Sequence, residues 1–302
     1  MNKTRVGFIG LGMMGHGMAK NLVIKGFPTV ILGHRNRAPV EDLIAQGAAE
    51  AGNPADLVLR SEIVFLCVTG SPQVEQVVYG THGLLSAARE GQIVVDCSTS
   101  EPVSTEKIHA DFAVRGVPFV DAPLARTPKE AEEGRLNVMV GAERDVYAKI
   151  EPVLRAFAEN IFHVGGPGAG HKFKLINNFF AMGQAALIAE ALVAAAKAGL
   201  DAETLFKVVS AGAPNSGIFQ MIVPSVLAGT YDGLQFGLDL ARKDVRYYTH
   251  LTESLGVPSM LGAAVHQAFV QASALGYGSE LVGSLVKAQE QITGTSVRRQ
   301  PC

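Results

Sequence analysis

The chain has 302 residues, of which 48% are hydrophobic and 18% charged. This is enough to bury a sizeable core and to form about two domains. Its 26 basic and 28 acidic residues give a formal net charge of −2. Such a balance provides no electrostatic reason to bind a polyanion or an anionic surface, so we expect neither nucleic acid nor a membrane as a partner.

Cysteine is scarce and odd in number: Cys67 and Cys97 lie in or beside apolar runs, and Cys302 is the last residue. This pattern predicts free thiols and a reducing, cytoplasmic setting. The apolar run Val6–Ile9 begins too early for a signal peptide to precede it. The histidines are scattered without metal-ligand spacing, so no metal is expected.

In the first half, short β-branched runs alternate with helix-like segments, which predicts an α/β fold with a mainly parallel, doubly wound Rossmann sheet. The expected strands are Arg5–Ile9, Thr29–Leu32, Ile63–Val68, Gln92–Asp96, Val117–Val120 and Leu136–Val140.

The glycine-rich stretch 165–170 ends this alternation and marks the predicted domain boundary. We expect a dinucleotide-binding Rossmann domain over 1–164 and an all-helical substrate and oligomerisation domain over 165–302. A long helix from about Lys172 to Ala198, closed by Gly199, would join them. Its apolar stretch Ala185–Ala196 is too short to span a bilayer and predicts a buried helix. Shorter helices are expected to begin at Asp201, Leu238, Pro258 and Glu280.

A Gly-x-Gly-x-x-Gly motif lies directly after the first expected strand and before a helix. Its residues are Gly10, Leu11, Gly12, Met13, Met14 and Gly15. One glycine permits the tight turn, one lets the backbone approach a diphosphate, and one allows close packing of helix on strand. The motif predicts dinucleotide binding at the helix N-terminus, and the alternative is a purely structural glycine turn.

The end of the second expected strand favours NADP over NAD. An acidic partner for the ribose hydroxyls is normally found there, but no carboxylate precedes Glu41. The chain instead offers His34, Arg35 and Asn36 as cofactor contacts, with Arg35 placed for a 2′-phosphate. The alternative is that Arg35 and Arg37 are solvated loop cations.

Two further loops are expected at the same edge of the sheet, where the cofactor of such a fold lies. Val68 and Thr69 follow one expected strand, and Thr99 follows the next. We predict all three as cofactor contacts, with Thr99 nearest the nicotinamide.

Several motifs together resemble the β-hydroxyacid dehydrogenase family, which includes 3-hydroxyisobutyrate dehydrogenases and tartronate semialdehyde reductases. The resemblance covers essentially the whole chain and implies an NAD(P)-dependent dehydrogenase or reductase. It is carried by the segment from Gly7 to Gly15, by Asp121–Ala122–Pro123 with Gly134–Arg135–Leu136, by Gly168–Ala169–Gly170 with Lys174 and Asn178, and by Lys243–Asp244.

The resemblance implies that Lys174 is the catalytic general acid and base. The chemistry agrees, because reducing an aldehyde builds negative charge on oxygen and needs a proton-donating cation beside it. Asn177 and Asn178 share its helix face and are predicted to bind substrate, since burying amides without partners is costly. The alternative for Lys174 is a solvated surface charge.

Lys243 matches the family's late Lys-Asp motif, which implies contacts with both the nicotinamide and the substrate. The alternative is an ordinary charged helix face formed with Asp239, Arg242 and Asp244.

One loop departs from the family pattern. After Pro123 most members carry Ser-Gly-Gly, whereas this chain has Leu124–Ala125–Arg126–Thr127–Pro128. The guanidinium of Arg126 suits a carboxylate, sulfonate or phosphate, so Arg126 and Thr127 are predicted substrate contacts. The loop is similar to that of the succinic semialdehyde and sulfolactaldehyde reductase branch, which implies a short semialdehyde with an anionic group as substrate. If Arg126 is solvated, an ordinary 3-hydroxy acid of the 3-hydroxyisobutyrate or tartronate semialdehyde type is the alternative.

Two other interpretations remain open: an imine reductase and a non-catalytic dinucleotide-binding protein. Relatives of both kinds generally lack the lysine, which this chain retains at Lys174. A homodimer or homotetramer is expected, because segments such as Ala185–Ala196 and Leu261–Val265 would leave apolar surface exposed on a single subunit.

Overall fold

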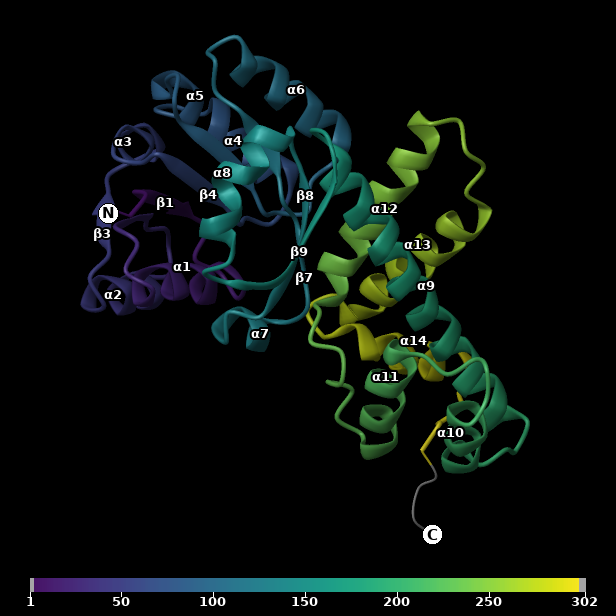
Figure 1. Cartoon of the computed structure of the whole chain (residues 1–302). Helices are drawn as coiled ribbons and strands as arrows, with labels where there is room; N and C mark the ends of the chain where they lie inside the picture. The colour runs from purple at the N-terminus through teal and green to yellow at the C-terminus, as the bar shows by residue number, and fades with distance from the viewer. Residues whose placement is uncertain (1–2, 299–302) are drawn as a thin grey trace. The chain divides into compact units, whose positions relative to one another are not determined.

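The computed structural model describes residues 3–298, so Cys302 lies outside the described part of the chain. The chain forms two compact units that divide between Lys174 and Leu175 (Figure 1). The boundary expected from sequence falls earlier, between residues 164 and 165, and those domain limits stay a prediction.

The first unit contains a parallel sheet in the order β3-β2-β1-β4-β5-β6, which is the Rossmann order. The predicted doubly wound α/β fold is therefore confirmed. The parallel strands are β1 (Val6–Ile9), β2 (Thr29–Leu32), β3 (Ala49–Ala51), β4 (Ile63–Leu66), β5 (Ile93–Asp96) and β6 (Phe119–Asp121).

Three more strands extend this sheet beyond β6. β8 (Leu136–Gly141) pairs antiparallel with β6 and with the short β7 (Leu124–Ala125), and parallel with β9 (Ala158–Gly165). β8 is expected from the sequence pattern, whereas β3, β7 and β9 are not.

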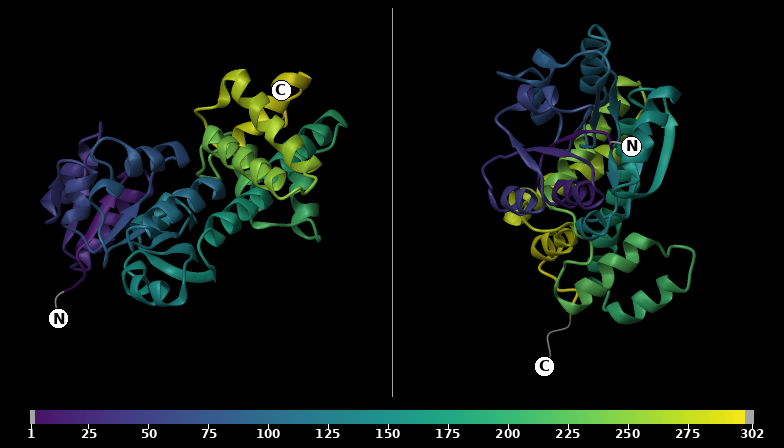
Figure 2. Two further views of the ribbon diagram at one scale, coloured as in Figure 1. Left: turned by 90° about the horizontal axis from the view of Figure 1, so that it is seen from above. Right: turned by 60° about the vertical axis from the view of Figure 1, so that its left-hand side comes forward.

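Helices cover both faces of the sheet because its strands are apolar on both sides. Phe8 and Phe65 pack with α1, α2, α7 and α8 in one core. Val64 and Leu66 pack with α3, α4, α5 and α6 in the other. Figure 2 shows helices on both sides of the sheet. The helices are α1 (Gly15–Ile24), α2 (Ala38–Ala45), α3 (Pro54–Leu59), α4 (Ser71–Tyr79), α5 (Leu84–Ala87), α6 (Pro102–Ala113), α7 (Pro128–Glu132) and α8 (Arg144–Leu154).

The second unit is helical, as predicted, and the long α9 (Ala169–Lys197) runs into it from the first. Met182 and Leu192 of α9 share one core with Phe219 and Phe269. The other helices are α10 (Ala202–Ser210), α11 (Gly217–Ala228), α12 (Leu238–Ser254), α13 (Met260–Ala272) and α14 (Leu285–Thr293), with a π-helical turn at Ser273–Tyr277 and a 3₁₀ turn at Val282–Ser284. Asp201 caps α10 by accepting a hydrogen bond from the Thr204 N–H.

Among the described residues, α9 is the one helix long and apolar enough to cross a membrane. Its inward side chains belong to the protein core, including Met182, Ala185 and Leu192. A core helix of this length meets the same criterion as a membrane span, so the observation does not indicate a membrane protein.

Candidate active site

The glycine motif forms the turn between β1 and α1, and each glycine has a distinct steric reason. Gly10 has φ +101°, and a side chain there would collide with the Cys67 carbonyl. A side chain at Gly15 would collide with the carbonyl of Gly10. Gly12 faces open space, because a side-chain Cβ at this position would meet no atom within 4 Å. The backbone at Gly12 is thus the part of the loop that a ligand can approach.

The turn is built for an anion. It leads into the N-terminus of α1, whose first turn contains no acidic residue. Helix N-termini present free N–H groups and partial positive charge to a bound phosphate. Gly12 and Met13 are exposed, and Leu11 and Met14 are partly so. These residues fit the diphosphate of a dinucleotide.

The loop after β2 exposes His34, Arg35 and Asn36. Arg37, in contrast, is paired within the chain: its guanidinium donates to both oxygens of Glu50, at 2.6 and 2.9 Å. The hydrogen bond from Arg37 lowers the pKa of the Glu50 carboxyl. Sequence reasoning missed Glu50 because it lies on β3, beside β2 in space but later in the chain.

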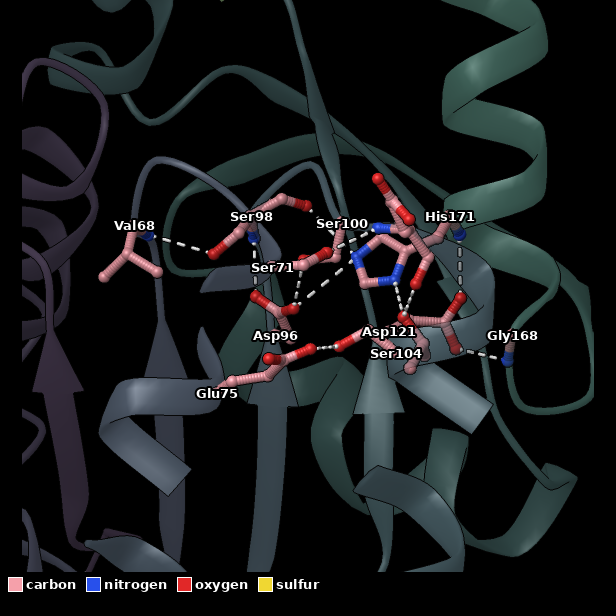
Figure 3. A network of polar contacts seen from close by, with 12 residues as sticks. Val68, Ser71, Glu75, Asp96, Ser98, Ser100, Ser104, Asp121, Gly168 and His171 are labelled. Atoms are coloured by element: carbon pink, nitrogen blue, oxygen red, sulfur yellow. Dashed lines mark hydrogen bonds and ion pairs between the residues drawn. The ribbon is translucent and has the colours of Figure 1, made fainter. Parts of the chain in front are cut away.

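The loops after β4 and β5 lie together, because Leu66 pairs with Asp96 in the parallel register. The Val68 N–H donates to Ser98 Oγ at 2.9 Å, which ties the two loops together (Figure 3). The Ser98 N–H donates to Asp96 Oδ1 at 2.9 Å. Thr69 is exposed and Thr99 partly exposed. The sheet thus brings Val68, Thr69 and Thr99 to the edge that carries Gly12.

A buried carboxylate fixes the start of the helix that bears Lys174. Asp121, at the end of β6, accepts the Gly168 N–H on Oδ1 at 2.7 Å and the His171 N–H on Oδ2 at 2.8 Å. A carboxylate at a helix N-terminus accepts hydrogen bonds from otherwise unpaired N–H groups. It also interacts favourably with the partial positive charge at that end of the helix. Lys174 follows His171 by three residues and is partly buried.

The predicted substrate residues Arg126 and Thr127 already have partners in the chain. Arg126 has φ +81°, and its guanidinium pairs with Glu159 and donates to the Arg135 carbonyl. Thr127 caps α7: its N–H donates to Glu130 Oε2 at 3.0 Å and its hydroxyl to the same carboxylate. The pKa of the Glu130 carboxyl is lowered, chiefly by the hydrogen bond that the Thr127 hydroxyl donates to it.

In the second unit, Asn178 is buried and its Nδ2 donates to Asp244 Oδ2 at 2.6 Å. Lys243 Nζ lies 3.0 Å from the other oxygen of Asp244. Asn177 is exposed, and its Nδ2 lies 3.4 Å from Asn178 Oδ1. From sequence, Asp244 is placed only in the Lys-Asp motif or in a charged helix face. Its bond to Asn178 joins residues 66 positions apart, so no local pattern indicates it.

The chain matches known families over most of its length. Residues 5–165 match the family model of the NAD binding domain of 6-phosphogluconate dehydrogenase. Residues 168–288 match the model described as NAD-binding of NADP-dependent 3-hydroxyisobutyrate dehydrogenase. The chain thus has the fold and binding loop of an NAD(P)-dependent oxidoreductase.

Individual proteins agree with these matches. 2-(Hydroxymethyl)glutarate dehydrogenase of Eubacterium barkeri is 36% identical and covers 97% of both chains. 3-Sulfolactaldehyde reductase of Escherichia coli K12 is 33% identical, over 91% of this chain and 92% of its own. The structure of Mycobacterium tuberculosis 3-hydroxyisobutyrate dehydrogenase with L-serine superposes with a TM-score of 0.86 at 25% identity, covering 95% of this chain and 99% of its own. The chain belongs to the 3-hydroxyisobutyrate dehydrogenase-like β-hydroxyacid dehydrogenase family.

Proposed function

We propose that the protein interconverts a short semialdehyde carrying an anionic group and the corresponding hydroxy acid. The observation that carries this proposal is Arg126, held in a left-handed loop conformation with its guanidinium in a partly exposed ion pair with Glu159. An incoming carboxylate or sulfonate can replace Glu159 as the partner of this guanidinium, whose planar fork suits such an oxygen pair. The names of two relatives, a sulfolactaldehyde reductase and a hydroxymethylglutarate dehydrogenase, describe substrates with such a group.

A reduced nicotinamide, when bound, would supply the hydride that the carbonyl carbon of the substrate receives. Lys174 donates a proton from Nζ to the carbonyl oxygen, where negative charge develops, and takes it back in the reverse direction. Asn178, one helical turn further along α9, orients the substrate, with Asp244 holding its amide nitrogen. Asn177, Thr127 and Lys243 complete the proposed substrate contacts, and Lys243 also serves the nicotinamide.

NADP is the proposed cofactor in preference to NAD. Arg35 is exposed after β2, and Glu50 on the neighbouring β3 is paired with Arg37. A 2′-phosphate there would meet a net positive charge. The second matching family is also described as NADP-dependent. The proposed cofactor contacts are Gly10, Leu11, Gly12, Met13, Met14, Gly15, His34, Arg35, Asn36, Val68, Thr69, Thr99 and Lys243.

A cytoplasmic homodimer or homotetramer is proposed as the working form. Cys67 and Cys97 are free thiols, as a reducing compartment requires. Large apolar side chains are exposed on α9 and α13, among them Phe180, Leu187 and Met260. A second copy of the chain would cover them.

The test is a panel of short semialdehydes and 3- or 4-hydroxy acids, assayed with NADPH and NADH by the absorbance of the reduced cofactor. Lys174→Ala should lower kcat about 10²- to 10⁴-fold, because the proton donor is lost. Lys172→Ala is the matched control, since this lysine pairs with Glu106 and should leave kcat unchanged.

The panel also separates the alternatives. Arg126→Ala should raise KM for semialdehydes that carry a carboxylate or sulfonate and leave uncharged aldehydes of the same length unaffected. An unchanged KM for all substrates would favour an ordinary 3-hydroxy acid. Dinucleotide binding without turnover of any carbonyl substrate would instead favour an imine substrate or a non-catalytic role.

A further inference from the structure

His171 is a buried titratable residue for which the proposed chemistry has no use. Its side chain is fully buried within the first unit, and both ring nitrogens have partners from other elements. Nδ1 lies 2.7 Å from the Thr105 hydroxyl of α6, and Nε2 lies 3.1 Å from the Ser98 carbonyl. Figure 3 shows the ring between the loop after β5 and the end of β6.

The contacts define which nitrogen carries a proton. A carbonyl oxygen only accepts hydrogen bonds, so Nε2 must be protonated and donate to Ser98. Asp96 Oδ2 lies 3.7 Å from the same nitrogen and favours this tautomer. The bond from Nε2 therefore links α9 to the backbone of Ser98, directly before Thr99.

The loop that receives this bond is itself held by side-chain hydrogen bonds. Asp96 accepts the Ser98 N–H and the Ser100 hydroxyl, each at 2.9 Å. Ser98 Oγ accepts the Val68 N–H. On the other side, the His171 N–H is held by Asp121. His171 thus connects two fixed parts of the unit: the loop that bears the proposed nicotinamide contact and the first turns of the helix that bears Lys174.

We propose that His171 is a positioning residue that sets the proton donor Lys174 relative to the nicotinamide-binding loop at Thr99. The inference rests on the proposed role of Lys174. Reduction needs the hydride and the proton to reach adjacent atoms of one carbonyl group, so an error of about 1 Å between their sources can cost ~100-fold in rate. A direct bond between the two supporting segments limits that error.

Two amide substitutions of His171 separate the contact at Nε2 from the contact at Nδ1. In His171→Gln the amide reaches the position of Nε2 and can still donate to Ser98. In His171→Asn the amide occupies the position of Nδ1, near Thr105, and cannot reach Ser98. Thr105→Val removes the contact at Nδ1, together with the bond of the Thr105 hydroxyl to the Glu101 carbonyl, and serves as a second control.

We expect His171→Asn to lower kcat about 10- to 100-fold, with KM and cofactor Kd within about twofold of the wild-type values. His171→Gln and Thr105→Val should keep most of kcat. Hydrogen exchange of the unliganded protein gives a readout independent of turnover: amides at 97–101 should exchange faster in His171→Asn but not in His171→Gln. Thermal unfolding of all three variants checks that folding is comparable.

Equal losses of kcat and of exchange protection in the Asn and Gln variants would make His171 an ordinary core residue and overturn the inference. Wild-type kcat and exchange in His171→Asn would overturn it as well. Failure of the proposed function is a separate result, recognised by full activity of Lys174→Ala. In that case the exchange data still decide whether His171 holds the Ser98 loop.

Discussion

Thr127 illustrates how a predicted ligand can also be a structural residue. Its N–H and hydroxyl both bond to Glu130, which forms a capping box at the start of α7. The loop bearing Arg126 enters the helix at this point. A substrate that engaged the Thr127 hydroxyl would therefore compete with the cap, whereas Arg126 has only to exchange one carboxylate for another.

Thr127→Ala should destabilise the fold by about 1 kcal/mol at neutral pH, the usual effect of losing an N-cap side chain. The Thr127 hydroxyl lowers the pKa of Glu130 from its ordinary 4.5. A lowered carboxyl pKa stabilises the fold above about pH 4.5 and loses this effect as the pH falls through the folded-state value. Urea unfolding should thus show a larger difference between Thr127→Ala and wild type at pH 7 than at pH 3.5. Thr127→Ser, which keeps the hydroxyl, should behave like wild type, and a difference independent of pH would contradict this account.

At the scale of elements, the strands found from sequence are those buried on both faces. β1, β4 and β5 are continuous runs of buried apolar residues, which a pattern of β-branched residues reveals. β3 is Ala-Glu-Ala with two exposed positions, and β9 contains mixed and partly exposed residues. These strands exist because a neighbour offers unpaired backbone groups, and this information is absent from the local sequence.

The β2–β3 pair controls cofactor choice in our proposal. Arg35→Ala should lower the NADPH-to-NADH ratio of kcat/KM about tenfold or more, because a charged hydrogen bond to the 2′-phosphate is lost. Glu50→Gln should raise the ratio, since it releases Arg37 toward the same phosphate. Arg5→Ala is the control, an exposed arginine before β1 that pairs with Glu62. Steady-state kinetics with both cofactors measure the effect, and an unchanged ratio in Arg35→Ala would indicate a solvated loop cation.

The junction of β6 and α9 depends on Asp121. Asp121→Asn replaces one acceptor by a donor that faces a helix N–H, so one buried N–H loses its partner. We expect a loss of stability of about 1–3 kcal/mol, measured by urea unfolding, together with a lower kcat. Asp111→Asn is the control, because Asp111 is a partly exposed carboxylate paired with Lys107. Equal losses in both variants would argue against a special role for the helix start.

For the whole molecule, the sequence was a good guide to the class and a weaker guide to the site. The glycine loop was predictable because it belongs to a local motif, and the role proposed for Lys174 likewise rests on a local motif. Partners that come from distant segments were not: Glu159 for Arg126, Asp244 for Asn178 and Thr105 for His171. Only the fold brings such residues together, and they decide whether a predicted ligand is available or already engaged.

Exposed apolar side chains on α9 predict that the protein forms an oligomer. Ile176, Phe180 and Leu187 are exposed on α9, and their spacing of four and seven residues places them on one helix face. Burying a leucine contributes about 1.5–3 kcal/mol, so introducing a charge there should weaken association at least tenfold.

We expect the wild type to be a dimer or tetramer by size-exclusion chromatography with light scattering at micromolar concentration, and Leu187→Glu to shift toward monomer. Leu200→Glu, at an exposed leucine after the end of α9, is the matched control. A monomeric wild type would refute the proposed assembly, whereas equal dissociation of both variants would move the interface away from this face of α9.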